Sequence, residues 1–161
     1  MRTLLLQVHL YAALLCSSYF VLFGISSLNY NHKFGDESRT EVGTWERQLR
    51  MPELDDRAMS QAVRDTLDLP GWTPWWRYRT DDEGTFHFEL VRPGKHYDMR
   101  LSSDGLLRVE EFRTGFWPVV NQLHAMMALP NAPLLTWWGV YTEFCFWVVV
   151  GSAASGVYLW T

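Results

Sequence analysis

TFHFELVRPGKHYDMRL, residues 85–101, decides the fold of the polar middle of this chain. Apolar and polar side chains alternate on both sides of Pro93-Gly94, which is typical of a hairpin of two strands. With a two-residue loop the numbers of paired residues add up to 187, so Phe86 lies opposite Leu101. One face of the pair is then wholly apolar, and a loop longer by two residues would keep the same faces. We predict an antiparallel sheet with one buried face.

The other face of this hairpin carries four side chains of metal-ligand type, namely His87, Glu89, His96 and Asp98. Their cross-strand spacing would suit a metal ion. Balanced charge on a solvated sheet face explains the same residues, and on that interpretation no metal site is expected.

Further elements flank the hairpin on both sides. Residues 75–79 (WWRYR) and 106–112 (LLRVEEF) have the alternation of strands, and Asp55 or Asp56 would cap a helix whose apolar positions recur at three and four. We therefore predict a domain over residues 55–115, a helix followed by an antiparallel meander. Residues 29–54 lack a sustained period and are predicted to be a linker with one short helical turn. A domain of this size has a thin core, which contact with a membrane or a partner would help to hold.

The charged residues are confined to this middle part. The chain has 14 Lys and Arg and 18 Asp and Glu, and all but Arg2 and Glu143 lie between Lys33 and Arg113. Two long apolar stretches remain, one within residues 1–28 and one within residues 134–161. Each exceeds the roughly 30 Å of a bilayer core when helical. We predict two antiparallel membrane spans, which the mean hydropathy of −0.13 conceals.

Residues 116–133 connect the sheet to the second span. Their apolar stripe predicts an interfacial amphipathic helix with Asn121 and His124 on its polar side. Two spans place both termini on one side of the membrane, and the positive charge of Arg2 favours the cytoplasm. A cleaved signal peptide is the alternative for the N-terminus, although the apolar stretch is longer than an ordinary signal core and lacks a following A-x-A site.

Glu143 is the only charged residue within either apolar stretch. A carboxylate at this depth must face protein or be protonated, because facing lipid costs on the order of 2 kcal/mol or more. Ser18 and Tyr19 lie at its level on the first span, so we expect hydrogen bonds to them. A contact with another subunit and a proton relay are the alternatives. Gly151 and Ser155 form a small-x-x-x-small pair that favours close helix packing.

Several classes of function lack their motif in this sequence. There is no nucleophile elbow, phosphate-binding loop, C-x-x-C pair or C-x-x-C-H haem attachment site. The net charge of −4 argues against nucleic acid as a partner. Cys16 and Cys145 fall in the apolar stretches, so we expect packing roles for them rather than a disulfide.

Short motifs occur at both ends of the chain. The first span opens with Arg2 and continues through HLY at residues 9–11, an LH pair stands at 123–124, and SGVYLW ends the second span at 155–160. In this arrangement the chain resembles the PepSY-associated transmembrane helix family. The resemblance implies a bacterial inner-membrane protein with cytoplasmic termini and a periplasmic PepSY module. Longer members have four helices, which bind haem b through histidines for ferric-siderophore reduction.

Only His9 and His124 stand at positions that match those histidines, and the chain is expected to have two helices rather than four. His9 would lie near the cytoplasmic end of the first span and His124 at the periplasmic face. Two axial ligands must each approach one iron to about 2 Å. We therefore expect no haem in the isolated chain, and a haem b would need a histidine from a partner. His9 would otherwise hydrogen-bond to Gln7 or a neighbour.

The sequence thus predicts an α+β membrane protein, in which two antiparallel transmembrane helices flank a small PepSY-like helix-plus-meander domain. An aromatic content of 16%, with nine Trp, suits a protein that contacts the lipid bilayer and other integral membrane subunits. The preferred hypothesis is a non-catalytic accessory subunit of a larger inner-membrane complex, in particular a respiratory or photosynthetic electron-transfer assembly. The alternatives are a haem-b reductase that works as an oligomer and a periplasmic inhibitor or sensor.

Overall fold

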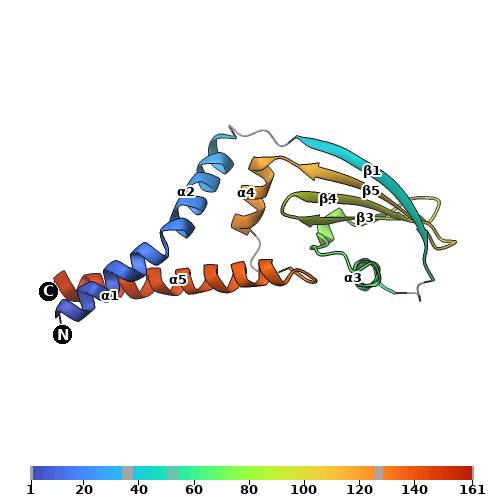
Figure 1. Ribbon diagram of the computed structural model, residues 1–161. Helices are drawn as coiled ribbons and strands as arrows, with labels where there is room; N and C mark the ends of the chain where they lie inside the picture. The colour runs from blue at the N-terminus through green and yellow to red at the C-terminus, as the bar shows by residue number, and fades with distance from the viewer. Residues whose placement is uncertain (1, 34–37, 51, 53, 126–128, 161) are drawn as a thin grey trace.

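The computed structural model describes the chain except for residues 1, 34–37, 51, 53, 126–128 and 161. A helical arm projects from a sheet domain, and both termini lie together at the far end of the arm (Figure 1). The helices are α1 (Arg2–Leu15), α2 (Ser17–His32), α3 (Asp56–Thr66), η1 (Trp75–Arg77), α4 (Phe116–Ala125) and α5 (Pro133–Trp160). The strands are β1 (Arg39–Gln48), β2 (Arg79–Thr80), β3 (Phe86–Arg92), β4 (Lys95–Leu101) and β5 (Leu106–Thr114).

The five strands form one antiparallel sheet in the order β1-β5-β4-β3-β2. The predicted hairpin register is confirmed, because Phe86 pairs with Leu101 and Arg92 with Lys95. Gly94 has a φ of 86°, which glycine adopts without steric cost and which suits the second central position of a type II turn.

Helix α3 covers the apolar face of the sheet. Its N-cap is the predicted one, since the Asp55 carboxylate accepts a hydrogen bond from the backbone N–H of Ala58 at 2.9 Å. Val63 of α3 is fully buried between the helix and the strands. The buried core consists of Leu49, Val63, Phe86, Phe88, Leu90, Tyr97, Met99, Leu101, Leu107 and Val109.

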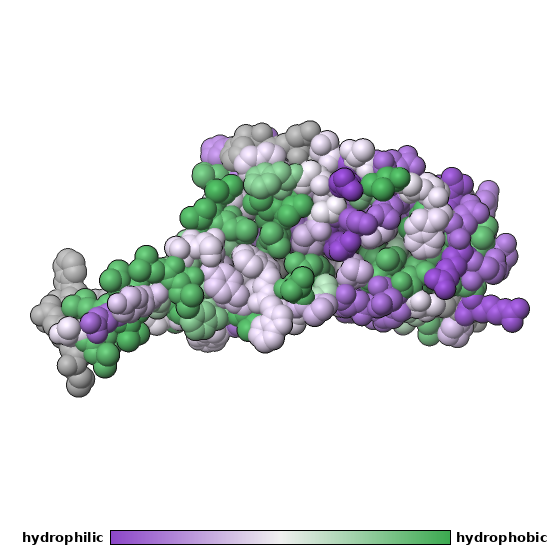
Figure 2. Space-filling model, in the orientation of Figure 1, coloured by the Kyte–Doolittle hydropathy of each residue, from purple (hydrophilic) through white to green (hydrophobic). Residues whose placement is uncertain are grey.

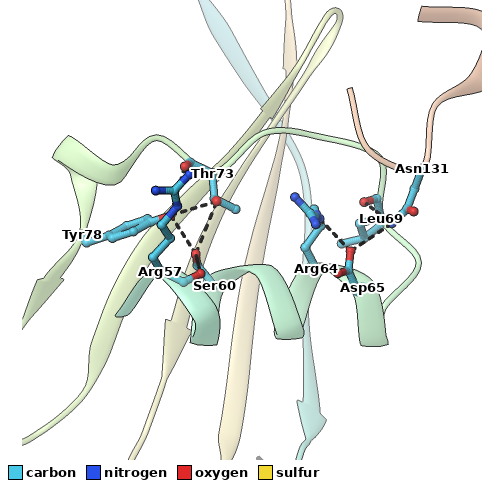
Figure 3. Close-up of polar contacts among 8 residues, drawn as sticks. All are labelled: Arg57, Ser60, Arg64, Asp65, Leu69, Thr73, Tyr78 and Asn131. Atoms are coloured by element: carbon cyan, nitrogen blue, oxygen red, sulfur yellow. Dashed lines mark hydrogen bonds and ion pairs between the residues drawn. The ribbon is translucent and has the colours of Figure 1, made fainter. Parts of the chain in front are cut away.

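Two groups of polar contacts tie α3 to its neighbours (Figure 3). At the start of the helix the Ser60 hydroxyl lies 2.7 Å from the Tyr78 hydroxyl, which donates to the Thr73 carbonyl at 3.0 Å. At its end, Asn131 Nδ2 donates to Asp65 Oδ1 at 3.4 Å. The second contact links the sheet domain to the segment that leads into α5.

The prediction of a linker over residues 29–54 is wrong for residues 29–32, which are helical, and for residues 39–48, which form a strand. Helix α2 continues to His32, and β1 pairs along its whole length with β5. Most side chains of β1 are exposed on both faces, so this edge strand has no apolar alternation for sequence reasoning to detect. Its hydrogen bonds to β5, rather than a buried side, hold it in place.

The strand predicted over residues 75–79 is also wrong. Residues 75–77 form the short helix η1, which the hydrogen bond from Arg77 N to the Pro74 carbonyl closes at 3.0 Å, and only Arg79–Thr80 remain as β2. Tyr78 packs against the core, whereas Trp76 stays 56% exposed. The two rings therefore do not lie on the same side of this segment, as they would in a strand.

Helix α5 is long and apolar enough to cross a membrane, with a mean hydropathy of 1.3 over its best window. The first apolar stretch is not the continuous span that we predicted. It consists of α1 and α2, bent by 50° at Cys16, and passes the same test only if the bent pair is taken as one span. Apolar residues gather along this arm, and hydrophilic ones gather at the sheet end (Figure 2).

A side chain of α5 explains the bend. The Tyr141 hydroxyl donates to the Leu15 carbonyl at 2.9 Å and lies 2.7 Å from Ser18 Oγ. In a continuous helix that carbonyl would instead accept from the backbone N–H of Tyr19. An inserted hydroxyl of this kind is an established cause of helix kinks.

The interfacial helix predicted over residues 116–133 is α4, which ends at Ala125, and residues 126–128 lie outside the described part of the chain. Helix α4 packs along α2, with Asn29 Nδ2 donating to Asn121 Oδ1 at 3.3 Å. Its polar residues therefore face a helix, not water, because α2 offers them polar partners.

Candidate functional site

The interface between the arm's helices brings together several residues that the sequence singled out. Cys16 and Cys145 are both fully buried, and their thiols contact each other as free cysteines, in line with packing roles. His9 Nδ1 lies 3.4 Å from Ser155 Oγ. Gly151, by contrast, is exposed, and no atom outside its own helix lies within 4 Å of the position where its Cβ would be.

Glu143 does not bond to Ser18 or Tyr19, so that prediction is wrong. Ser18 pairs with Tyr141, two residues before the expected partner, and Glu143 Oε1 accepts a hydrogen bond from Trp147 Nε1 on its own helix at 2.9 Å. The reason is rotational position, because Glu143 lies on the exposed side of α5, about 160° around the helix from Tyr141.

We call this exposed side the outer face of α5. It comprises Val140, Glu143, Trp147, Val150 and Gly151. Trp147 is 61% exposed, and Glu143 lies about 15 Å along the helix axis from Pro133.

His124 is held between α4 and α2. Its ring stacks on Phe23 with centroids 4.2 Å apart, and its Nδ1 lies 2.5 Å from Ser26 Oγ. Burial lowers the pKa of His124, which favours the neutral ring at pH 7. The expectation that His124 lies on the polar, water-facing side of its helix is wrong.

His9 and His124 lie at separate places in the arm. His9 contacts α5, whereas His124 contacts Ser26 of α2, 17 residues further along the bent pair. At 1.5 Å per residue, with the bend allowed for, the two histidines are roughly 20 Å apart. They do not meet at one iron within a single chain.

The polar face of the sheet brings three of its four candidate metal ligands together. The ligand atoms of Glu89, His96 and Asp98 lie within 4.8 Å of one another, while His87 instead contacts Asp81 at 2.9 Å. His96 is only 2% exposed, so its ring depends on partners in the chain.

The contacts of His96 favour an ionic network over a metal site. Its Nε2 lies 2.6 Å from Asp98 Oδ1 and 3.0 Å from Arg39 Nη1. The guanidinium group of Arg39 lies beside Nε2 and would repel a cation at this place. The hydrogen bond from His96 lowers the pKa of Asp98, as do the positive charges nearby.

Beside this network lies a cavity of about 290 Å³ between the polar face of the sheet, η1 and the α2–α4 pair. Its wall includes Tyr30, Arg39, Trp76, Glu89, Thr114 and Gln122. Sequence reasoning missed it because the wall comes from seven separate elements, and Arg39 lies on the strand that was predicted as linker. No motif signals such a convergence.

Function must be inferred from this geometry. No protein-family model matches the chain, and neither does a curated protein or a solved structure.

Proposed function

We propose that this protein is a non-catalytic accessory subunit of a larger bacterial inner-membrane complex. The bent α1–α2 pair and α5 would serve as two spans, with both termini cytoplasmic and the sheet domain periplasmic. The observation that carries the proposal is the carboxylate of Glu143 on the exposed outer face of α5, within the apolar run of this helix.

A carboxylate in this place needs more than the chain provides. Facing lipid, an ionised acid costs about 3 kcal/mol at the centre of a span. A carboxylate has about four lone-pair sites, and the single N–H of Trp147 occupies one of them. A donor on a neighbouring membrane protein would offset the cost.

The surroundings of Glu143 suit a helix partner. Gly151 leaves open space two turns further on, which permits close backbone approach. Trp147 and Val150 supply exposed apolar area on either side. Small, aromatic and polar groups on one helical face are the composition of an intramembrane helix–helix contact.

Photo-crosslinking in native membranes tests this proposal. Benzoylphenylalanine in place of Val150, on the outer face of α5, should give one adduct of defined mass with another membrane protein. The matched control has the same group in place of Leu10, which is 57% exposed on α1 and should give no such adduct. Glu143→Gln should preserve the adduct, and Glu143→Leu should reduce it at least fivefold.

Two outcomes would contradict the accessory role. One is the absence of a protein adduct from position 150. The other is an equal yield from positions 150 and 10, since random collisions would produce it. If Glu143→Gln kept the adduct but stopped electron or proton transfer by the host complex, the carboxylate would be catalytic and the proposal would fail.

The proposal has a corollary for haem. The resemblance to haem-binding membrane reductases favours an electron-transfer complex as host, but a haem b would need a histidine from a partner to complement His9 or His124. The purified monomer should therefore have no Soret band. A band near one equivalent per chain that His9→Ala abolishes would contradict this arrangement.

A further inference from the structure

The cavity beside the sheet has unmet hydrogen-bonding groups on its wall. Thr114 Oγ1 and Gln122 Oε1 are buried atoms without a hydrogen-bond partner among the residues that the structure describes. Thr114 is only 9% exposed. Native structures rarely leave such groups unpaired, so each calls for a partner such as an ordered water, an ion or a ligand.

The same wall carries separated charges. The guanidinium groups of Arg39 and Arg77 line the cavity, together with the carboxylate of Glu89, whose Oε2 lies 3.9 Å from Arg77 Nε. The Arg77 side chain is 56% exposed, and Arg39 is exposed although its Nη1 lies 3.0 Å from His96 Nε2. The remaining N–H groups of both arginines can donate to an anion. An arginine pair suits a phosphate, and a carboxylate suits an ammonium or hydroxyl group.

The cavity also lies where the apolar arm joins the sheet domain. Tyr30 of α2 forms part of its wall, and so do Trp72 and Trp76. The Gly71 N–H donates to the Pro130 carbonyl at 3.4 Å, which places Trp72 close to the segment that leads into α5. Tyr and Trp with exposed rings are enriched at the membrane–water interface.

We propose that this cavity binds the headgroup of a membrane phospholipid. The phosphate would lie between Arg39 and Arg77, and the terminal hydroxyl or ammonium group would reach Thr114, Gln122 and Glu89. The volume of about 290 Å³ is at the lower end of the range for small-ligand sites and accommodates a headgroup, not acyl chains. The acyl chains would extend past the tryptophans along the arm.

Native mass spectrometry of the full chain in mild detergent tests the assignment. The probes are dihexanoyl phosphatidylethanolamine, dihexanoyl phosphatidylglycerol, and dihexanoylglycerol, which lacks the phosphate. One molecule of a phospholipid should stay bound per chain, and the diacylglycerol should not. Arg39→Gln should lower the bound fraction at least fivefold.

Two further variants sharpen the result. Thr114→Val keeps the shape of the side chain and removes the hydroxyl, so it should lower the bound fraction two- to threefold. Arg108→Gln is the matched control, because Arg108 is a half-exposed arginine on the same sheet that does not line the cavity. This control should retain lipid like the unaltered chain, and circular dichroism checks that each variant is folded.

Three results would overturn the proposal. Equal retention of dihexanoylglycerol would mean that the acyl chains alone bind to the helices. Undiminished binding by both Arg39→Gln and Thr114→Val would place the lipid elsewhere. Binding of soluble phosphoethanolamine or glycerol phosphate as tightly as the lipids would identify a soluble phosphate ester as the ligand. The inference rests on the proposed membrane topology and not on the accessory role, since lipid retention does not require the crosslink from position 150.

Discussion

The sheet domain and the helical arm differ in how far they bury their apolar side chains. In the domain, α3 closes over the sheet and leaves the core residues of β3, β4 and β5 at most 7% exposed. In the arm, the helices bury the thiols of Cys16 and Cys145 in a narrow seam beside the half-buried Tyr141, while large apolar side chains point outward. The domain therefore supplies its own interior, whereas the arm leaves most of its large apolar side chains exposed.

The largest expected effect of a substitution lies in the domain core. Leu107 on β5 is fully buried, so Leu107→Ala should lower the free energy of unfolding by about 3 kcal/mol through lost burial and the resulting cavity. Chemical denaturation of the detergent-solubilised chain, followed by tryptophan fluorescence, measures it. Leu10→Ala in the arm is the matched control and should cost less than about 0.5 kcal/mol. Equal losses of unfolding free energy in the two variants would contradict the proposed difference in burial between domain and arm.

A smaller effect is expected at the bend of the arm. Tyr141→Phe removes the hydroxyl that bonds to the Leu15 carbonyl and to Ser18, so the arm should lose about 1–2 kcal/mol of stability while the domain keeps its own. Helical circular dichroism and tryptophan fluorescence would then report separate transitions. Tyr11→Phe, at an exposed ring on α1, is the control. Unchanged stability of Tyr141→Phe would show that the hydroxyl does not hold the bend.

The smallest effect is a pH dependence in the domain. The hydrogen bond from His96 lowers the pKa of Asp98 below its unfolded value, so protonation penalises the folded state. The resulting stability is present above about pH 4 and is lost as the pH falls through the folded pKa. Because the Asp98 side chain is 36% exposed, we expect less than about 1 kcal/mol.

Denaturation midpoints between pH 6 and pH 3 measure this loss. Asp98→Asn should flatten the acid limb of the profile, whereas Asp104→Asn, at an exposed turn position whose carboxylate does not contact His96, should leave it as it is. An unaltered acid limb in Asp98→Asn would mean that the contact with His96 contributes nothing to folding.

Patterns that depend on local chemistry were predictable from the sequence. The register of β3 and β4 follows from a two-residue loop and alternating side chains, and the start of α3 follows from the cap at Asp55. The length and position of α5 follow from its apolar run. In each case one segment contains the whole signal.

Features that arise from contacts between distant segments were not predictable. Strand β1 exists because β5 offers it hydrogen bonds, and the bend at Cys16 exists because Tyr141 reaches it from α5. The outward position of Glu143 depends on how α5 rotates against α1, which no spacing within either helix reveals. The cavity wall likewise joins residues as far apart as Tyr30 and Gln122.

The central proposal is that the arm spans a membrane, with the termini on one side and the sheet domain on the other. Labelling with an impermeant thiol reagent tests it directly, because the native thiols of Cys16 and Cys145 are buried. Ser103→Cys, at an exposed turn of the sheet, should react in intact cells, and Thr3→Cys, beside the termini, should react only after lysis. Labelling of both positions in intact cells, or of neither, would contradict the two-span arrangement.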